Sequence, residues 1–257
     1  MKPKVSIIIL SYNARELVRT LDHSITKHCI GTPYEVICVD NGDDGTSDIP
    51  GINFIKHDNS GNFSSQNNMA SKYAQGETLI FLNNDMVARS DFVTHMHTVL
   101  DLMPNVGIVG ACLYYPDDTL QHAGVMIQNN LFPANIGEKA IKECALDEKN
   151  VRPANWNQTS VNGFAATTGA CMAIRTKDFM ALGGFHEEFE WNFEDVDLCF
   201  RMQLHLRKLV TVSPLAVLTH LESQTGSSRH LETPLCLLQG RWRGIIHSDM
   251  HRFQSRG

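Results

Sequence analysis

Three carboxylates fall within four consecutive positions of this chain, at Glu194, Asp195 and Asp197. Their neighbours are aromatic or apolar, because Trp-Asn-Phe precedes the first of them and a valine separates the two aspartates. Acidic side chains are seldom left in such a setting unless they are ion-paired, hydrogen-bonded or bound to a cation. A carboxylate held there can take a proton from a reacting hydroxyl, so the stretch predicts a general base.

A second acidic site lies far upstream, where Asn83-Asn84-Asp85 follows the apolar run at 79–82. Asp85 offers hard oxygen ligands of the kind that Mg²⁺ and Mn²⁺ take from proteins, together with substrate phosphates. A metal ligand at a strand end and a base on a helix together suggest group transfer from a phosphorylated donor. Taken alone, Asp85 could equally be a turn residue.

Other residues in these stretches have simpler interpretations. Asp195 and Asp197 could be the solvated first turn of a helix, where acids interact favourably with the helix dipole. We expect Asp197 to pair with Arg201, one helical turn further on. A lone histidine at a strand end is more often structural, so His220 carries little by itself. We expect His122, which follows a turn, to be a structural hydrogen-bonding residue.

Strand and helix patterns alternate through the first half of the chain. Apolar β-branched runs predict strands, and apolar residues at helical spacing predict the helices between them. The strands are expected at 5–10, 34–39, 52–56, 78–82 and 106–113, and the helices at 14–25, 63–74 and 91–103. Such alternation is typical of an α/β fold with a mostly parallel central sheet flanked by helices.

The second half is less regular, and the segment 129–160 is polar and expected to be loop-rich. The remaining patterns predict strands at 167–175, 209–212 and 215–219, helices at 178–182 and 195–206, and a helical tail from residue 231. The candidate base Asp195 would therefore open a helix.

Polar side chains follow four of the predicted strands, at Asn13, Asp40, Asn59 and Asp85. Because ligands of parallel α/β sheets bind at the carboxyl ends of the strands, we expect these residues to share one ligand-binding edge. The first strand is followed by neither a Gly-x-Gly-x-x-Gly motif nor a phosphate-binding Gly-x-x-x-x-Gly-Lys-Ser/Thr loop. These absences argue against a dinucleotide-dependent dehydrogenase and a nucleoside triphosphatase.

The composition narrows the class further. A formal net charge of −6 over 257 residues gives no reason to expect nucleic-acid binding. Seven cysteines without a Cys-x-x-Cys pair fit reduced core residues. The apolar run at 5–10 is too short for a signal peptide or a membrane span. We expect a cytoplasmic protein, with peripheral contact at the inner face of the plasma membrane as a further option.

Several strings, in order along residues 4–228, resemble family 2 glycosyltransferases with a GT-A (Rossmann-like) fold. Those typical of the fold and class are Val5-Ser6-Ile7-Ile8-Ile9-Leu10-Ser11-Tyr12-Asn13, Val39-Asp40-Asn41-Gly42, Phe81-Leu82-Asn83-Asn84-Asp85 and Glu194-Asp195-Val196-Asp197-Leu198. Others resemble a bacterial subgroup linked to O-antigen, capsule and other surface polysaccharides. These are the stretch 61–68, Gln121-His122-Ala123-Gly124, Thr168-Gly169-Ala170-Cys171, Gly183-Gly184-Phe185 and His220-Leu221-Glu222-Ser223.

The resemblance implies a role for each matching position. The sugar-nucleotide donor would be bound by Ser11, Asn13, Asp40, Asn59, Asn67, Asn83 and Asn84. A divalent cation, Mg²⁺ or Mn²⁺, would be held by Asp85 and His220. Catalysis would involve Asp195 as the base and Glu194 beside it, and the acceptor would be bordered by Thr168, Gly169 and Trp191. Asn83 stands where many family members have aspartate, which should weaken its contact with ribose or metal.

The implied enzyme is an inverting glycosyltransferase that moves a sugar from a UDP- or dTDP-sugar to a glycan or lipid-linked glycan during bacterial surface polysaccharide synthesis. Two alternatives remain open. One is a non-catalytic sugar-nucleotide-binding module of a larger assembly. The other is a sugar nucleotidyltransferase, although the residues after the first strand lack the Gly-rich, Arg/Lys-bearing loop usual in that class.

The expected domain spans residues 1–228, with a nucleotide-sugar-binding half at 4–115 and an acceptor-binding and catalytic half at 116–228. The arginine-rich tail at 229–257 is expected to be helical. It would pack on its own domain, join a further domain, or contact an anionic membrane surface.

Overall fold

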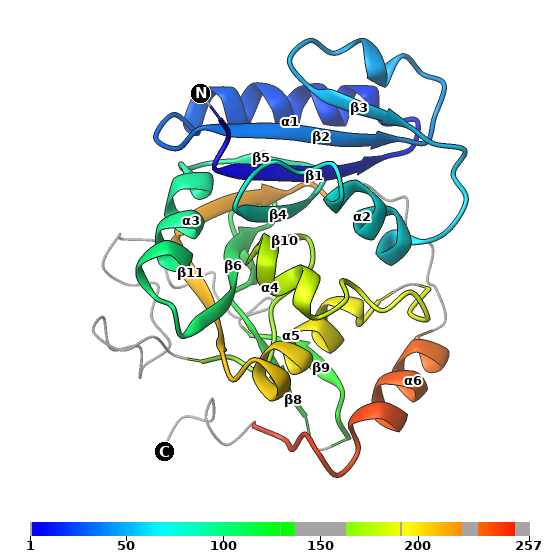
Figure 1. The fold of residues 1–257 in the computed structure, drawn as a ribbon, viewed down its shortest axis with the longest axis vertical. Coiled ribbons are helices and arrows are strands. Elements are labelled where there is room, and N and C mark those ends of the chain that lie inside the picture. Colours follow the sequence, from blue (N-terminus) through cyan, green and yellow to red (C-terminus); the bar gives the residue numbers. More distant parts are fainter. Residues whose placement is uncertain (1, 129, 137–162, 191, 223–230, 250–257) are drawn as a thin grey trace.

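The computed structural model describes residues 2–128, 130–136, 163–190, 192–222 and 231–249 (Figure 1). Its strands are β1 (Val5–Ser11), β2 (Tyr34–Asp40), β3 (Asn53–Lys56), β4 (Thr78–Asn83), β5 (Met86–Ala88), β6 (Val106–Tyr114), β7 (Leu120–His122), β8 (Val125–Ile127), β9 (Pro133–Asn135), β10 (Cys171–Arg175) and β11 (Leu209–His220). Its helices are α1 (Arg15–His28), α2 (Phe63–Ser71), α3 (Phe92–Leu102), α4 (Thr176–Ala181), α5 (Glu194–His205) and α6 (Glu232–Trp242), with a short 3₁₀ helix η1 (Thr46–Asp48).

One mixed sheet organises the described chain. Its strand order is β3-β2-β1-β4-β10-β6-β11-β5, and β7 pairs with β6. Strands β3, β2, β1 and β4 run parallel, whereas β10 is antiparallel to both of its neighbours. A separate hairpin, β8–β9, stands apart from this sheet. The mostly parallel α/β sheet expected from the sequence is therefore confirmed.

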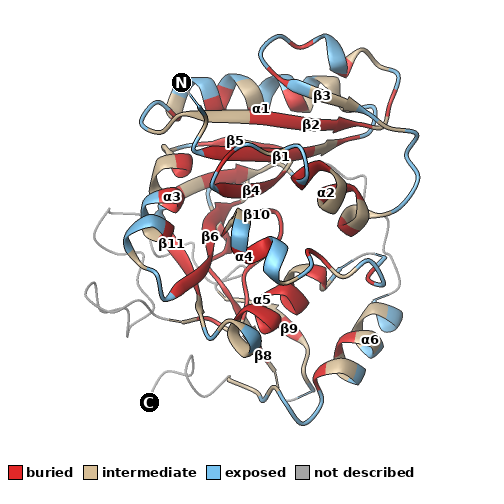
Figure 2. Cartoon of the chain, viewed as in Figure 1, coloured by how far each residue is buried: buried red, intermediate tan, exposed pale blue. Residues whose placement is uncertain are grey.

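The central strands are buried on both faces, which explains why they are almost continuously apolar in sequence (Figure 2). Successive side chains of a strand point to opposite faces. Ile7 and Ile9 of β1 accordingly join the core beneath α1 and α3, and Ile8 joins the core shared by α4, α5 and α6. The described sheet is thus covered by helices on both sides.

Several element bounds differ from the sequence-based expectation. The two strands predicted at 209–212 and 215–219 are one strand, β11, with a register shift between Ser213 and Val217. Pro214 lies in this irregularity, where its missing N–H breaks no regular ladder bond. The strand predicted at 167–175 begins only at Cys171, because residues before it form a turn at the site described below. The hairpin strand β9 lies inside the segment predicted to be loop-rich.

Two further findings bear on the earlier expectations. No helix among the described residues is long and apolar enough to cross a membrane. The six cysteines that the structure describes are all free, and five of them are buried.

Candidate active site

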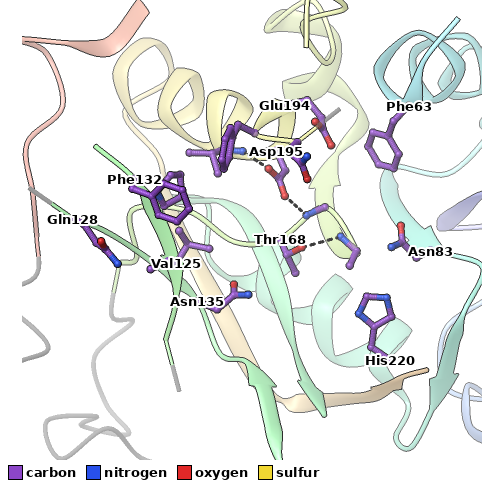
Figure 3. Close-up of a pocket in the computed structure, with 17 residues that line it drawn as sticks. Phe63, Asn83, Val125, Gln128, Phe132, Asn135, Thr168, Glu194, Asp195 and His220 are labelled. Carbon is purple, nitrogen blue, oxygen red and sulfur yellow. Dashed lines mark hydrogen bonds between the residues drawn. The ribbon is translucent and has the colours of Figure 1, made fainter. Parts of the chain in front are cut away.

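A cavity of about 620 Å³ opens at the edge of the sheet where β4 and β11 end and β10 begins (Figure 3). It brings together residues from six separate parts of the chain. Of the residues expected to be functional, it is lined by Asn83, Thr168, Gly169, Glu194, Asp195 and His220. The rest of its wall is formed by Phe63, Val125, Gln128, Phe132, Pro133, Ala134, Asn135, Ala170, Asn192, Phe193 and Val196.

The chain enters α5 through a strained turn. Asn192 and Phe193 both have left-handed backbones, with φ of 65° and 69°. Asparagine tolerates this conformation, but a bulky aromatic residue rarely adopts it. Such strain persists only where surrounding structure imposes it, and it is concentrated at functional sites. The turn delivers the next two residues, Glu194 and Asp195, to the cavity wall.

Asp195 is held by two backbone amides. The N–H of Gly169 donates to Oδ2 (2.6 Å), and the N–H of Val196 donates to Oδ1 (2.7 Å). A Cβ atom at position 169 would lie 3.2 Å from the Cβ of Asp195, so glycine permits the close approach. Burial raises the pKa of the Asp195 carboxyl, and the two amide bonds oppose that rise. The carboxylate is therefore fixed in position and has enhanced basicity.

Glu194 lies deeper than its neighbour. It is buried, and among the described residues its Oε2 has no hydrogen-bond partner. Burial, reinforced by the negative charge of Asp195, raises the pKa of the Glu194 carboxyl to about 8. Burial thus raises the pKa of both neighbouring carboxyls, and the value of about 8 for Glu194 favours its protonated form at neutral pH.

Asp85 and His220 meet because β5 pairs with β11 in a register that sets His220 opposite Met86. Oδ1 of Asp85 lies 3.2 Å from Nε2 of His220. The backbone N–H of Leu221 also donates to the carbonyl of Asp85 (2.9 Å), which fastens the two strand ends together.

A side-chain relay sets the orientation of the His220 ring. Nε2 of Gln121 donates to the carboxylate of Glu222 (2.8 Å), which can only accept, so Oε1 of Gln121 faces the histidine. Nδ1 of His220 donates to that oxygen (2.8 Å). In the neutral ring, Nε2 then carries the lone pair and is aimed at the Asp85 side.

These two side chains fit a divalent cation that is completed by other ligands. The described residues contain no group of three or more His, Cys, Asp or Glu side chains suited to a metal. Mg²⁺ and Mn²⁺ commonly use one or two protein ligands and take the remaining oxygens from substrate phosphates and water. One carboxylate and one imidazole with its lone pair available match that pattern.

The residues expected to bind the donor are more scattered. Asn83 lines the cavity, Asn84 is half-buried beside it, and Asn13 and Asn59 are exposed. Asn67 is buried within α2, where its Nδ2 donates to the carbonyl of Phe63 (2.9 Å). These roles stay predictions.

Asp40 and Ser11 lie at neighbouring strand ends and are both buried. The Asp40 carboxylate accepts from the Gly42 N–H (3.1 Å) and the Ser47 hydroxyl (3.0 Å), and Lys56 lies 3.4 Å away. In this structure Asp40 therefore shapes the loop after β2. Its contact with a nucleobase stays a prediction.

A hydrogen-bonded cluster at this edge escaped the sequence analysis. Nδ2 of Asn41 donates to the Ser11 carbonyl (3.1 Å) and to Oε1 of Gln66 (2.9 Å). Oδ1 of Asn41 lies 2.9 Å from Nδ1 of His57. The cluster joins the ends of β1, β2 and β3 to α2. The one sequence signal for it is the polar residue Asn41 directly after Asp40.

His122 is structural, as expected. Its Nδ1 lies 2.8 Å from Oδ1 of Asn135 and its Nε2 lies 2.9 Å from the hydroxyl of Thr167. Burial lowers the pKa of His122 to about 4, so the ring is neutral. By joining β7 to β9 and to the turn before Thr168, it supports the cavity floor.

Asp197 pairs with Arg201 (2.7 Å), also as expected. Trp191 lies outside the described residues.

Comparison with known proteins gives the class. The family model described as Glycosyl transferase family 2 matches residues 6–144, and the chain belongs to that family. It is 32% identical over 252 residues to the uncharacterized protein y4gI of Sinorhizobium fredii, covering 90% of this chain and 26% of that protein. It is 29% identical over 227 residues to the O-antigen biosynthesis protein RfbC of Myxococcus xanthus, covering 85% of this chain and 17% of that protein. The chain thus spans about a quarter or less of these relatives.

Solved structures define the fold. GalNAc-T7 with UDP, GalNAc and Mn²⁺ superposes with a TM-score of 0.66 at 14% identity, covering 88% of this chain and 46% of that one. The mannosyltransferase PcManGT from Pyrobaculum calidifontis, with GDP-Man and Mn²⁺, gives a TM-score of 0.59 at 16% identity, covering 88% and 59%. The chain has the GT-A fold expected from its sequence motifs.

Proposed function

We propose that this domain is a metal-dependent inverting glycosyltransferase that moves a sugar from a nucleotide-diphosphate sugar to a hydroxyl of a glycan acceptor. One observation carries the proposal. The Asp195 carboxylate lies in the cavity between His220 and Asn83 on one side and the aromatic side chain of Phe132 on the other (Figure 3). A base between a diphosphate-binding side and an acceptor-binding side is what a direct displacement requires.

The chemistry follows from the state of Asp195. Its carboxylate takes the proton of an acceptor hydroxyl as that oxygen bonds to the anomeric carbon. The bond from this carbon to the diphosphate oxygen breaks on the opposite face, so the configuration inverts. The amides of Gly169 and Val196 hold the carboxylate in place. The neutral carboxyl of Glu194 can donate a hydrogen bond to a substrate oxygen.

A divalent cation, when bound, neutralises charge on the leaving diphosphate. Asp85 and His220 would hold it, and the relay through Gln121 and Glu222 keeps the histidine lone pair available. The Mn²⁺ in the GalNAc-T7 and PcManGT complexes supports a cation in this domain, either Mn²⁺ or Mg²⁺.

The acceptor side of the cavity carries two aromatic rings. Phe132 and Phe193 lie with ring centroids 6.2 Å apart and planes at 79°. Aromatic rings bury the apolar C–H face of a pyranose, and Gln128 and Asn135 nearby offer amides to its hydroxyls. This combination supports a sugar residue as the acceptor, bordered by Thr168 and Gly169. The likeness to an O-antigen biosynthesis protein supports a surface glycan in particular.

The donor nucleotide is proposed to be UDP or dTDP. The UDP in the GalNAc-T7 complex supports a uridine donor, whereas the GDP-Man bound to PcManGT makes guanosine donors the necessary comparison. Both solved structures share only the fold with this chain, at low sequence identity, so the nucleobase of the donor is a matter for direct measurement.

The test is release of nucleoside diphosphate from a panel of UDP-, dTDP- and GDP-sugars with Mn²⁺, with water or simple methyl glycosides as acceptors. We expect turnover with a uridine or thymidine donor, and NMR should show that an α-linked donor first releases the β sugar. Release of the α sugar would contradict inversion.

Controls separate the two alternatives. Donor binding without any turnover would identify a non-catalytic binding module. Pyrophosphate release from a nucleoside triphosphate and a sugar 1-phosphate would identify a nucleotidyltransferase. Asp195→Asn should abolish turnover, whereas Glu190→Gln, which changes an exposed acid nearby, should not.

A further inference from the structure

The C-terminal part of the described chain, residues 231–249, is packed onto the domain. Leu238 and Trp242 of α6 are buried in the core that also contains α5. The rings of Trp242 and Phe200 of α5 meet edge to face, with centroids 5.2 Å apart and planes at 71°. The contact therefore joins α6 directly to the helix that begins with the candidate catalytic carboxylates.

A buried hydrogen bond makes this contact specific. Nε1 of Trp242 donates to Oδ1 of Asp197 (3.0 Å), while Nε of Arg201 donates to Oδ2 of the same carboxylate (2.7 Å). Arg241 lies 4.0 Å from Oδ1. Asp197 is wholly buried, so these groups supply the interactions that offset its removal from water.

Asp197 sits in the first turn of α5, one residue beyond Val196. Its own N–H donates to the carbonyl of Phe193 (2.9 Å), which closes that turn over the strained backbone. The position of Asp197 therefore helps to determine how Asp195 is presented to Gly169. A displacement of about 1 Å at a reacting group can lower the rate by about 10²-fold.

The same segment also reaches the opposite wall of the cavity. Oδ1 of Asp249 accepts from the N–H of Ile127 in β8 (2.7 Å), and the N–H of Asp249 donates to the carbonyl of Ile127 (3.1 Å). Nε2 of Gln239 donates to the carbonyl of Asn130, at the turn of the β8–β9 hairpin (2.7 Å). Residues 239–249 thus connect the hairpin that carries Phe132 to the start of α5.

We propose that residues 239–249 brace the active site, and that Trp242 is a positioning residue that acts on Asp195 through Asp197. The effect on catalysis rests on the proposed role of Asp195 as the base, whereas the effect on local structure does not. Neither Trp242 nor Asp197 lines the cavity, so the polar link from Trp242 to α5 runs through the hydrogen bond to Asp197.

A matched pair of variants separates positioning from general stability. Trp242→Phe keeps an aromatic ring and removes the N–H, and Trp242→Tyr is a second substitution if the first folds poorly. Leu238→Ala, one turn earlier on α6, removes part of a buried side chain of the same core and no hydrogen bond. A Leu→Ala change in a core is expected to cost at least as much stability as the loss of one hydrogen bond.

Two measurements are made on the full chain. The first is hydrogen exchange of the Gly169 amide, which bonds to Asp195, and it needs no substrate. The second is nucleoside diphosphate release from the best donor of the panel. For Trp242→Phe we expect Gly169 exchange at least about 10-fold faster and kcat about 10-fold lower, with the donor KM unchanged. For Leu238→Ala we expect a lower Tm with Gly169 exchange and kcat near wild type.

Unchanged Gly169 exchange in both tryptophan variants would overturn the brace. So would parallel losses in Leu238→Ala and Trp242→Phe that simply follow Tm. If the wild-type protein releases no diphosphate from any donor, the proposed function fails, and the exchange measurement still decides the brace.

Discussion

Nε2 of His220 lies 3.2 Å from Oδ1 of Asp85, although Asp85 lies in the turn before β5 and His220 ends β11, far away in the sequence. Antiparallel pairing of β5 with β11 creates this proximity, since it aligns His220 with the residue directly after Asp85. Pairing register therefore builds the candidate metal site, and local sequence does not.

The first prediction concerns this pair. Asp85→Ala and His220→Ala should each lower Mn²⁺ affinity and donor turnover severely, because each removes one of the two proposed protein ligands. Mn²⁺ titration by electron paramagnetic resonance measures binding without turnover. Asp101→Ala removes an exposed acid elsewhere and should bind Mn²⁺ normally. Full activity in excess chelator would remove the cation from the mechanism.

The second prediction concerns the relay behind His220. Gln121→Met removes the acceptor for Nδ1–H and frees the ring to rotate, so Mn²⁺ affinity should fall about 10-fold, the lower end for groups that orient metal ligands. Gln75→Met, at an exposed glutamine, is the matched control. Equal affinities in wild type and Gln121→Met would show that the ring is held by other contacts.

The third prediction concerns the base. Asp195→Asn keeps the shape of the side chain and removes its basicity, so transfer should fall by at least about 10²-fold with donor affinity nearly unchanged. Asp197→Asn should mainly cost stability, because it weakens the pairing with Arg201 while its Oδ1 can still accept from Trp242. An active Asp195→Asn beside an inactive Glu194→Gln would place the base on the other carboxylate.

The fourth prediction is a pH dependence of stability. The folded-state pKa of Glu194 is raised from an ordinary 4.5 to about 8, so folding favours its protonated form. The stability linked to this group is fully present below the unfolded pKa and is lost as pH rises through the folded pKa. The free energy of unfolding, measured with urea between pH 5 and 9, should therefore decline more steeply with rising pH for wild type than for Glu194→Gln. Glu190→Gln, at an exposed position, should follow wild type; a wild-type slope in Glu194→Gln would contradict the assignment.

The fifth prediction concerns the aromatic wall. Phe132→Ala should raise the acceptor KM and leave hydrolysis of the donor by water nearly unchanged, because Phe132 lies on the side of Asp195 away from His220 (Figure 3). Phe54→Ala, which changes a partly buried ring in β3, provides a control. An equal loss of donor hydrolysis in Phe132→Ala would assign the ring to the donor sugar.

Local patterns of apolar residues in the sequence were sufficient to predict much of the fold. Alternating apolar runs and helical spacing predicted the main strands and helices, and the spacing of Asp197 and Arg201 predicted their ion pair. Those features depend on residues close together in sequence. Short strands such as β5 and β9 carry too few residues to show a period, and they position His220 and Phe132.

The candidate site was less predictable for the same reason. Sequence motifs indicated Asp195 and Glu194, but the burial that raises the pKa of both carboxyls comes from the whole fold. The bond between Trp242 and Asp197 joins residues that share no local pattern. Burial of Asp40 depends on how the loop after β2 folds back over it.

The left-handed pair Asn192 and Phe193 has an evolutionary consequence. Each such residue costs on the order of 1–3 kcal/mol, so substitution by glycine at either position would relieve backbone strain. Laboratory selection for heat resistance should therefore favour substitutions at these two positions. The gain in folding stability would come from relaxing the turn that positions the carboxylates. A gain in thermal stability at these positions should lower the turnover rate. A thermostable variant that stays active should therefore carry its substitutions elsewhere in the chain.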